Sequence, residues 1–269
     1  MERVTILLDS GAVASLAPVR QPSWEGGRRL ELRLEGFSTA TSAEEQGRQL
    51  SQAVLWMAIS LNYGLRLSYR TREPSTVFER LKARGDTAWG EGEVGWQPQV
   101  VLEQLVAGFA APVPDLQTLL SMEIFCSASL EASDRAKFLT AVSALEPLAE
   151  SQPLGREVDD FVDQCLRLLR ANTSIDGKHR LSLEGRLRDL KCESIRQALR
   201  RVMRMRVPDY PAAFDVAYSA YTIRSKLIHE GRLPDYDIDI VAETRKIGNL
   251  LRLIYAESLG LKLFAPAAV

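Results

Sequence analysis

The stretch YTIRSKLIHEG, residues 221–231, indicates most clearly that this chain folds into helices. Phe214, Tyr221 and Ile228 recur every seven residues, a spacing that puts them on one face of a helix. We expect this to be the apolar face that packs into the core. Gly231 is the residue type that most often follows the end of a helix, so we expect the helix to stop there.

Helical spacing of apolar residues extends over the whole chain beyond Pro98. The predicted helices cover residues 101–109, 116–126, a segment after Ser133, 158–169, 183–190 leading into 195–202, about 211–230 and about 239–259. We therefore predict an antiparallel helical bundle joined by short turns.

The N-terminal third alternates between strand and helix patterns. Residues 4–8 and 30–34 favour strands, residues 42–61 favour a helix that Ser42 caps, and residues 65–70 favour a further strand. Residues 71–97 are rich in glycine and keep no sustained period, which is typical of a connection. The sequence therefore predicts a mainly α protein, with a small α+β (ββαβ) module plus linker over residues 1–97 and an all-α domain over residues 98–269.

Composition limits the possible function classes. The chain has 269 residues, is 46% hydrophobic and 26% charged, and carries a formal net charge of −1. It is not a polycation that coats nucleic acid, so any such affinity must come from a local patch. No cationic start followed by an apolar stretch is evident, and the most apolar segment, residues 53–61, is too short to span a bilayer. We expect a cytoplasmic protein that does not bind membranes.

The sequence contains no motif typical of a metal site or a cofactor site. Cys126, Cys165 and Cys192 form no CxxC pair, and we expect them to be buried free thiols. Phosphate-binding loops, dinucleotide fingerprints, hydrolase triads and zinc-ligand spacings do not occur. Asp159, Asp160 and Asp163 have no nearby His or Cys and are typical of a polar helix face. We therefore predict no metal site and no cofactor.

A second face of the helix before Gly231 carries only hydroxyl groups and an imidazole. Its members follow one another at offsets of four, three and four residues: Tyr218, Thr222, Ser225 and His229. A solvent face would usually carry Glu, Lys or Gln, whereas these groups can hydrogen-bond within a confined site. The helix dipole favours an imidazolium in the last turn. We expect a functional site here, centred on Arg224 and His229.

Arg224 and His229 do not lie side by side on a regular helix, because residues five apart differ by about 140° around the axis. Either the last turn distorts, or a second copy completes the site across a two-fold axis. The small residues Ala213, Ala217 and Ala220 would let another helix approach closely, which favours a homodimer through this helix. The structural alternative is that Arg224 pairs with a carboxylate such as Glu146 while His229 caps the helix end.

These residues resemble a known family. Tyr221, followed by IRSKLIHEG at residues 223–231 on the penultimate helix, is similar to the signature of HEPN domains (higher eukaryotes and prokaryotes nucleotide-binding). The upstream stretch from Phe138 to Glu146 is also similar to that group, especially to the ApeA-like HEPN proteins of bacteria. The resemblance covers roughly residues 115–260 and leaves out the N-terminal module.

The resemblance implies a metal-independent endoribonuclease that acts as a dimer on single-stranded RNA, in bacterial phage defence or toxin-like RNA degradation. Arg224 and His229 match the motif arginine and histidine. His229 would move a proton to or from the ribose 2′-OH or the leaving 5′-oxygen, and Arg224 would stabilise charge on the phosphate. The products would carry 2′,3′-cyclic phosphate ends. Many active members place Asn, Asp or His directly after the arginine, where this chain has Ser225.

A basic stripe precedes the site along the chain: Arg196, Arg200 and Arg204 fall on one helical line, with Arg201 beside it. Such a stripe can follow an RNA backbone, although a solvated helix face also explains it. Three hypotheses therefore stand. The first is a HEPN-type ribonuclease whose catalytic residues are Arg224, His229 and Ser225, with Tyr218, Thr222 and Glu146 in support. The second is an inactive HEPN module that binds a nucleotide, RNA or a protein such as an antitoxin or defence partner. The third is a purely structural helical protein.

Overall fold

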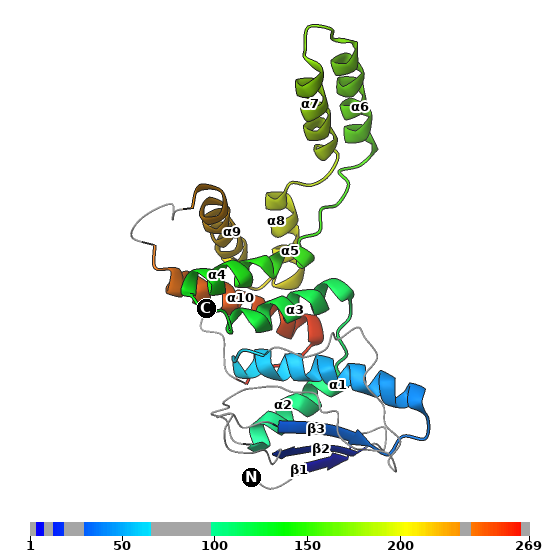
Figure 1. The fold of residues 1–269 in the computed structure, drawn as a ribbon, viewed down its shortest axis with the longest axis vertical. Helices are drawn as coiled ribbons and strands as arrows, with labels where there is room; N and C mark the ends of the chain where they lie inside the picture. Colours follow the sequence, from blue (N-terminus) through cyan, green and yellow to red (C-terminus); the bar gives the residue numbers. More distant parts are fainter. Residues whose placement is uncertain (1–3, 8–12, 19–29, 66–97, 232–237, 265–269) are drawn as a thin grey trace.

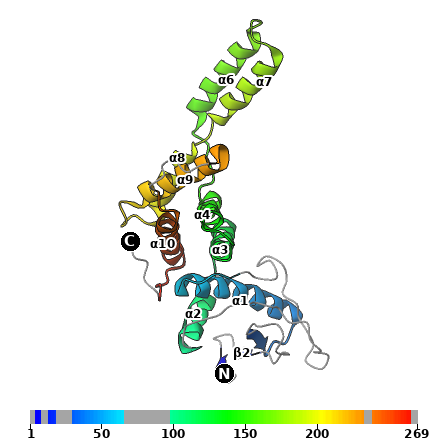
Figure 2. The same ribbon diagram turned by 60° about the vertical axis from the view of Figure 1, so that its left-hand side comes forward.

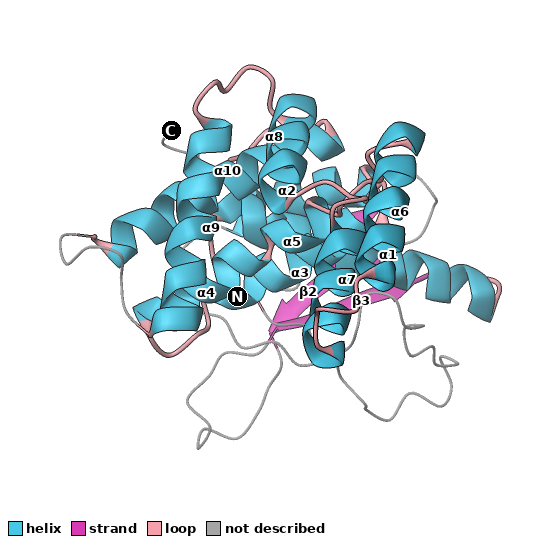
Figure 3. Cartoon of the chain, turned by 90° about the horizontal axis from the view of Figure 1, so that it is seen from above, coloured by secondary structure: helices cyan, strands magenta, loops and turns pink. Residues whose placement is uncertain are grey.

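The computed structural model describes residues 4–7, 13–18, 30–65, 98–231 and 238–264. Within these residues the protein is mainly helical, as predicted, and its strands lie in the N-terminal part (Figures 1 and 3). The elements are β1 (Val4–Leu7), β2 (Val13–Pro18), β3 (Leu30–Glu35), α1 (Ala40–Leu61), α2 (Pro98–Ala110), α3 (Leu116–Ala128), α4 (Asp134–Ser143), α5 (Leu145–Leu148), α6 (Arg156–Ala171), α7 (Gly177–Asp189), α8 (Ile195–Arg206), α9 (Ala213–Glu230) and α10 (Ile240–Leu259). None of the described helices is long and apolar enough to cross a membrane.

The three strands form one antiparallel sheet in the order β1-β2-β3. Val4 lies opposite Leu16 in the first pair, and Val13 lies opposite Glu35 in the second. The sequence predicts β1 and β3 but not β2, because VASLAP lacks strict alternation and ends in proline. Within the described residues, three strands therefore precede α1 instead of the predicted two. The strand predicted at residues 65–70 lies almost entirely outside the described residues.

Helix α1 packs closely against α2 beside the sheet (Figure 1). The helix begins after Thr39, whose hydroxyl accepts the Ser42 backbone N–H, so Ser42 lies inside the helix and is not its cap. Gly108 allows the close approach of α2, because a Cβ there would lie 2.8 Å from the Trp56 ring and 3.0 Å from Ala53 Cα. The pair buries a small core of Leu50, Ala53, Leu105 and Phe109.

The other face of α1 belongs to the main core, which α3, α4, α5, α8, α9 and α10 complete. Trp56, Phe138 and Tyr255 are among its largest buried side chains. Arg252 of α10 is buried with them and donates from Nε to the Ile59 carbonyl at 2.9 Å and from Nη2 to the Ser60 carbonyl at 3.2 Å. Burial lowers the pKa of Arg252. Its guanidinium joins α10 to the C-terminal end of α1. Helix α1, which precedes the domain boundary predicted at residue 97, therefore packs against helices that follow that boundary.

Helices α6 and α7 form a hairpin that projects from the bundle in both side views (Figures 1 and 2). The sequence predicts them as members of the bundle, and this part of the prediction is wrong. Only Val162 and Leu166 of α6 are buried, and α7 buries no residue fully. Their apolar residues are enough to pair the two helices but do not reach the main core.

Helix α9 ends as predicted at Gly231, whose φ is 69°. Its core face differs from the predicted one, because the buried residues are Ala213, Ala217, Ala220 and Ile223. Phe214 and Tyr221 are half-buried, and Ile228 is exposed. The alanines let α9 lie close to α4, α8 and α10, so the small-residue stripe packs within the chain and the larger residues sit at its margin.

Candidate functional site

Arg224 on α9 forms an ion pair with Glu146 on α5. Its Nη2 lies 2.8 Å from Oε1 of Glu146, and its side chain is 18% exposed against 47% for the carboxylate. The guanidinium carbon lies 6.0 Å from the centre of the Tyr221 ring. The buried Nε has no hydrogen-bond partner among the described residues. This ion pair is the one expected if Arg224 has only a structural role. The Nε–H donor of Arg224 remains without an acceptor among the described residues.

His229 is exposed in the last turn of α9. The helix continues without distortion through Glu230, which excludes a distorted last turn. The side chains of Arg224 and His229 therefore leave the helix about 140° apart. Within one chain the structure does not bring these two residues together.

The stripe of hydroxyl groups that ends at His229 is partly occupied by hydrogen bonding within α9. Thr222 Oγ1 donates to the Tyr218 carbonyl at 2.8 Å, one turn earlier. Ser225 is half-buried and Thr222 is exposed. The Tyr218 ring stacks on the Phe214 ring, with centroids 5.6 Å apart and planes 12° apart. An aromatic pair thus begins the stripe, and the exposed imidazole ends it.

Two of the predicted RNA-binding arginines lie over this aromatic pair. The guanidinium of Arg196 is 4.9 Å from the centre of the Tyr218 ring, and that of Arg200 is 4.5 Å from the centre of the Phe214 ring. Both arginines are exposed on α8, as is Arg204 one turn further along. This pairing of rings with cations is not predicted from the sequence. Each pair has the i, i+4 spacing of a helix face, but only the structure shows that α8 and α9 place the two faces together.

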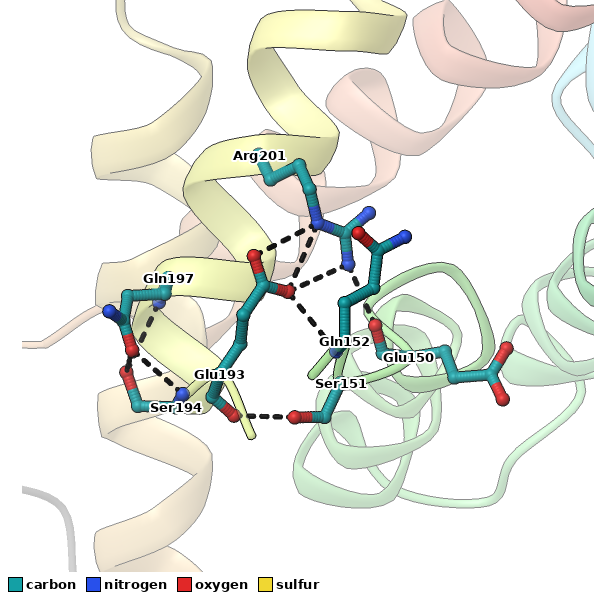
Figure 4. A network of polar contacts seen from close by, with 7 residues as sticks. All are labelled: Glu150, Ser151, Gln152, Glu193, Ser194, Gln197 and Arg201. Atoms are coloured by element: carbon teal, nitrogen blue, oxygen red, sulfur yellow. Dashed lines mark hydrogen bonds and ion pairs between the residues drawn. The ribbon is translucent and has the colours of Figure 1, made fainter. Parts of the chain in front are cut away.

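Arg201 has a different role from its neighbours, at the base of the α6–α7 hairpin (Figure 4). It is in an ion pair with Glu193 at 3.0 Å and donates to the Glu150 carbonyl at 2.7 Å. The hydrogen bond from Arg201 holds the pKa of Glu193 below its ordinary value. Ser151 and Gln152 bind Glu193 as well, so both connections of the hairpin are joined at this point.

Among the described residues, neither a cluster of metal-ligating side chains nor the pocket on the hairpin coincides with the predicted site residues. In the described ranges no group of three His, Cys, Asp or Glu side chains can hold a metal ion. A pocket of about 480 Å³ lies on the hairpin and is lined by Asp163, Leu166, Arg167, Arg170, Arg188 and Lys191. None of the predicted site residues lines it.

Of the cysteines, only Cys126 is buried as predicted, whereas Cys165 is half-buried and Cys192 is exposed.

Comparison of the chain with protein-family models, with curated proteins and with solved structures finds no match.

Proposed function

We propose that this protein is a metal-independent endoribonuclease of the HEPN type that cleaves single-stranded RNA. The observation that carries this proposal is the continuous surface from α8 along α9. It begins with Arg200 and Arg196 over two stacked rings and ends at the exposed imidazole of His229. The exposed guanidinium groups can bind RNA phosphates, so the surface suits an RNA strand that runs toward His229.

The proposed chemistry needs one proton carrier and one cation. The ribose 2′-oxygen attacks the adjacent phosphorus while the bond from phosphorus to the 5′-oxygen breaks. His229 takes the 2′-OH proton and delivers a proton to the leaving 5′-oxygen, so no proton is gained or lost overall. Arg224 donates the guanidinium N–H groups that are not bound to Glu146 to the phosphate. The products are a 2′,3′-cyclic phosphate and a 5′-hydroxyl end. DNA lacks the nucleophile and stays intact.

We propose further that two copies contribute to one site, because Arg224 and His229 lie on different sides of an undistorted α9. The alanine stripe no longer supports this dimer, since the core of its own chain buries it. Mixing two inactive variants, Arg224→Ala and His229→Ala, tests the idea. Half of randomly mixed dimers are mixed pairs with one intact site, so we expect about a quarter of the wild-type cleavage rate to return. A mixture as inactive as its components contradicts the composite site.

The proposed activity is tested by incubating purified full-length protein with a broad RNA pool in EDTA. We expect the wild type to cleave RNA and the His229→Ala variant to lose about a hundredfold or more of the rate, because a general acid or base contributes about that much. The matched control is His179→Ala, which removes the other histidine, exposed on α7. A His229→Ala variant as active as the control contradicts the proposal, provided both variants fold like the wild type.

The second candidate is a module that binds RNA without cleaving it, as a partner in bacterial defence or toxin regulation. The Arg224–Glu146 pair favours it, because the motif arginine already has a carboxylate partner. We expect Arg200→Gln with Arg204→Gln to weaken RNA binding and to reduce the salt slope by about 1.4, since each single-strand phosphate contact contributes about 0.7. The control is Arg156→Gln, an exposed cation on the distant hairpin. Equal affinities for both variants contradict RNA binding at this surface. A wild-type protein that binds RNA without cleaving it favours this candidate over the first.

A further inference from the structure

The pocket on the α6–α7 hairpin is lined by positive side chains from both of its helices. Its volume of about 480 Å³ is in the range of sites that hold small ligands. Leu166 of α6 is its buried apolar residue. The charged lining residues are Asp163, Arg167 and Arg170 of α6, Arg188 of α7 and Lys191 just beyond the end of α7. We call this group the hairpin pocket.

Two carboxylates hold three of these cations in position. The side chain of Glu184 on α7 is only 12% exposed, and it accepts from Nε and from Nη2 of Arg170, both at 3.2 Å. The same carboxylate accepts from Nη2 of Arg188 at 3.1 Å. Asp163 accepts from Nζ of Lys191 at 2.7 Å. Because these contacts form one network across the two helices, the cations are held beside the pocket instead of extending freely into water.

The cations of the hairpin pocket keep donors that the carboxylates do not use. Arg167 is exposed and forms no hydrogen bond or ion pair with any other described residue. The Nη1 groups of Arg170 and Arg188 donate to neither carboxylate. With Glu184 included, four cations stand against two carboxylates, which leaves a net charge of +2. Three guanidinium groups with free N–H donors and a surplus of positive charge are suited to a multiply charged anion.

The end of α7 contributes little opposing negative charge. The carbonyls at a helix C-terminus ordinarily carry a partial negative charge that disfavours anions. Here the carbonyls of residues 187–189 accept the backbone N–H groups of residues 190–192 at 3.0–3.2 Å. The charged side chains, and not open carbonyls, therefore determine which ligands the pocket attracts.

We propose that the hairpin pocket binds a small anion with two or more linked phosphate groups, such as an inorganic polyphosphate or a nucleoside polyphosphate. Arg167 and Arg170 bind it from α6, and Arg188 binds it from α7. Guanidinium groups match phosphate oxygens in pairs, so several arginines engage more than one phosphate group. The site is separate from the surface of α8 and α9, and the inference does not depend on the proposed ribonuclease.

Acidic residues beside the pocket favour a small anion over a nucleic acid strand. The hydrogen bond from Asp163, and at longer range the charges of Asp159 and Asp160, raise the pKa of Lys191. These acids belong to the first half of α6, toward the base of the hairpin, where Glu157 is also exposed. A strand that continued along α6 would meet this negative charge, whereas a small anion stays among the arginines.

Calorimetric titration of the full chain with sodium tripolyphosphate, without metal ions, tests the pocket. We expect saturable binding, and we expect Arg167→Gln to raise the dissociation constant about tenfold because charge-assisted hydrogen bonds to phosphate are lost. Arg167 has no ion-pair partner in the described chain, so its replacement leaves the fold intact. The matched control is Arg186→Gln, which removes the same charge from an exposed position of α7 outside the pocket.

We expect the control to change the dissociation constant by no more than about twofold, because a charge outside the site acts only through screened attraction. A wild type that does not bind tripolyphosphate at about 1 mM overturns the proposal. An Arg167→Gln variant that binds like the control also overturns it.

Hydrogen exchange of the bound protein locates the ligand. We expect tripolyphosphate to slow exchange of the backbone amides of α6 and α7, because it joins the two helices, and to leave α9 unchanged. Protection confined to α8 and α9 overturns the assignment to the hairpin pocket.

Titrations with other anions identify the ligand class. Sulfate has a single doubly charged group, so we expect it to bind more weakly than tripolyphosphate, and equal affinities overturn the requirement for linked phosphates. ATP that binds more tightly than tripolyphosphate supports a nucleotide, and ATP that binds equally supports recognition of the phosphates alone. Single-stranded RNA that depends on Arg167 while tripolyphosphate does not bind overturns the small-anion site. We expect His229→Ala to bind tripolyphosphate like the wild type, so failure of the proposed function and failure of this site can be told apart.

Discussion

Arg224 keeps a carboxylate partner whose loss costs little free energy. Glu146 is 47% exposed, and ion pairs open to water contribute about 0–1 kcal/mol. A phosphate that accepts two charge-assisted hydrogen bonds from the guanidinium gains more than this. The pair therefore positions Arg224 near the Tyr221 ring without preventing it from binding an RNA phosphate.

Ala217 provides a test of the packing that holds α9 in place. It is fully buried where α9 meets its neighbouring helices. We expect Ala217→Leu to lower the free energy of unfolding by about 1–3 kcal/mol, because three added carbon atoms have no space in a close-packed contact. Denaturant titration measures the change.

The matched control for this packing test is Ser219→Leu, an exposed position two residues further along the same helix. We expect it to change the free energy of unfolding by no more than about 0.5 kcal/mol. If both substitutions lower the free energy of unfolding equally, the alanine face of α9 is not the buried one. The core face is then the predicted one, with Phe214, Tyr221 and Ile228.

At the scale of elements, Asp115 links the start of α3 to the end of α8. Its carboxylate accepts the Thr118 backbone N–H at 2.6 Å and pairs with Arg206 at 3.2 Å. Burial raises the pKa of Asp115, but hydrogen bonds from Thr118 and Arg206 outweigh this, so the pKa lies below its ordinary value of 3.8. The ionised carboxylate, with its hydrogen bonds from Thr118 and its ion pair with Arg206, therefore adds stability above pH 3.8 that is lost as the pH falls through the lowered pKa.

Asp115→Asn removes the charge and keeps an oxygen for the helix cap. At neutral pH we expect the variant to be less stable than the wild type by roughly 0.5–1 kcal/mol, since the ion pair is partly exposed. Thermal unfolding at a series of pH values should show this difference shrinking below pH 3.8. A difference that stays constant or grows in acid shows that the charge of Asp115 is not what stabilises the α3–α8 contact.

Most helices are predictable from the sequence, because apolar periodicity and end signals act within one element. Gly231 fixes the end of α9 by its left-handed backbone, and no other part of the chain is needed to see this. Which face of α9 is buried depends on its neighbours. Hydrophobic size favours Phe214 and Ile228, whereas close helix contact selects Ala217, and only the assembled bundle decides between them.

The candidate site is predictable to a similar degree. The pairing of Arg224 with a carboxylate such as Glu146 can be anticipated, because an arginine on a partly buried helix needs an acidic partner. The role of Arg201 cannot be anticipated, since on α8 it looks like Arg200 and Arg204 until the hairpin connections reach it. The aromatic pair under Arg196 and Arg200 is hidden for the same reason, because it depends on how two helices pack.

At the scale of the whole molecule, the bundle holds α9 in place, and the surface of α8 and α9 is the one that we propose binds RNA. The hairpin, which sequence periodicity assigns to the bundle, projects from it (Figure 2). The hairpin escapes prediction because α6 has the amphipathic pattern of a bundle helix, and the pattern does not say what its apolar side packs against.

The ends of the RNA products test the central claim most directly. Full-length protein is incubated with a defined single-stranded RNA in EDTA, and the fragments are analysed by mass spectrometry. We predict 2′,3′-cyclic phosphate and 5′-hydroxyl ends with the wild type and with His179→Ala, and intact RNA with His229→Ala. Fragments with 3′-hydroxyl and 5′-phosphate ends, or cyclic phosphate ends that persist in the His229→Ala variant, would contradict the proposed chemistry at His229.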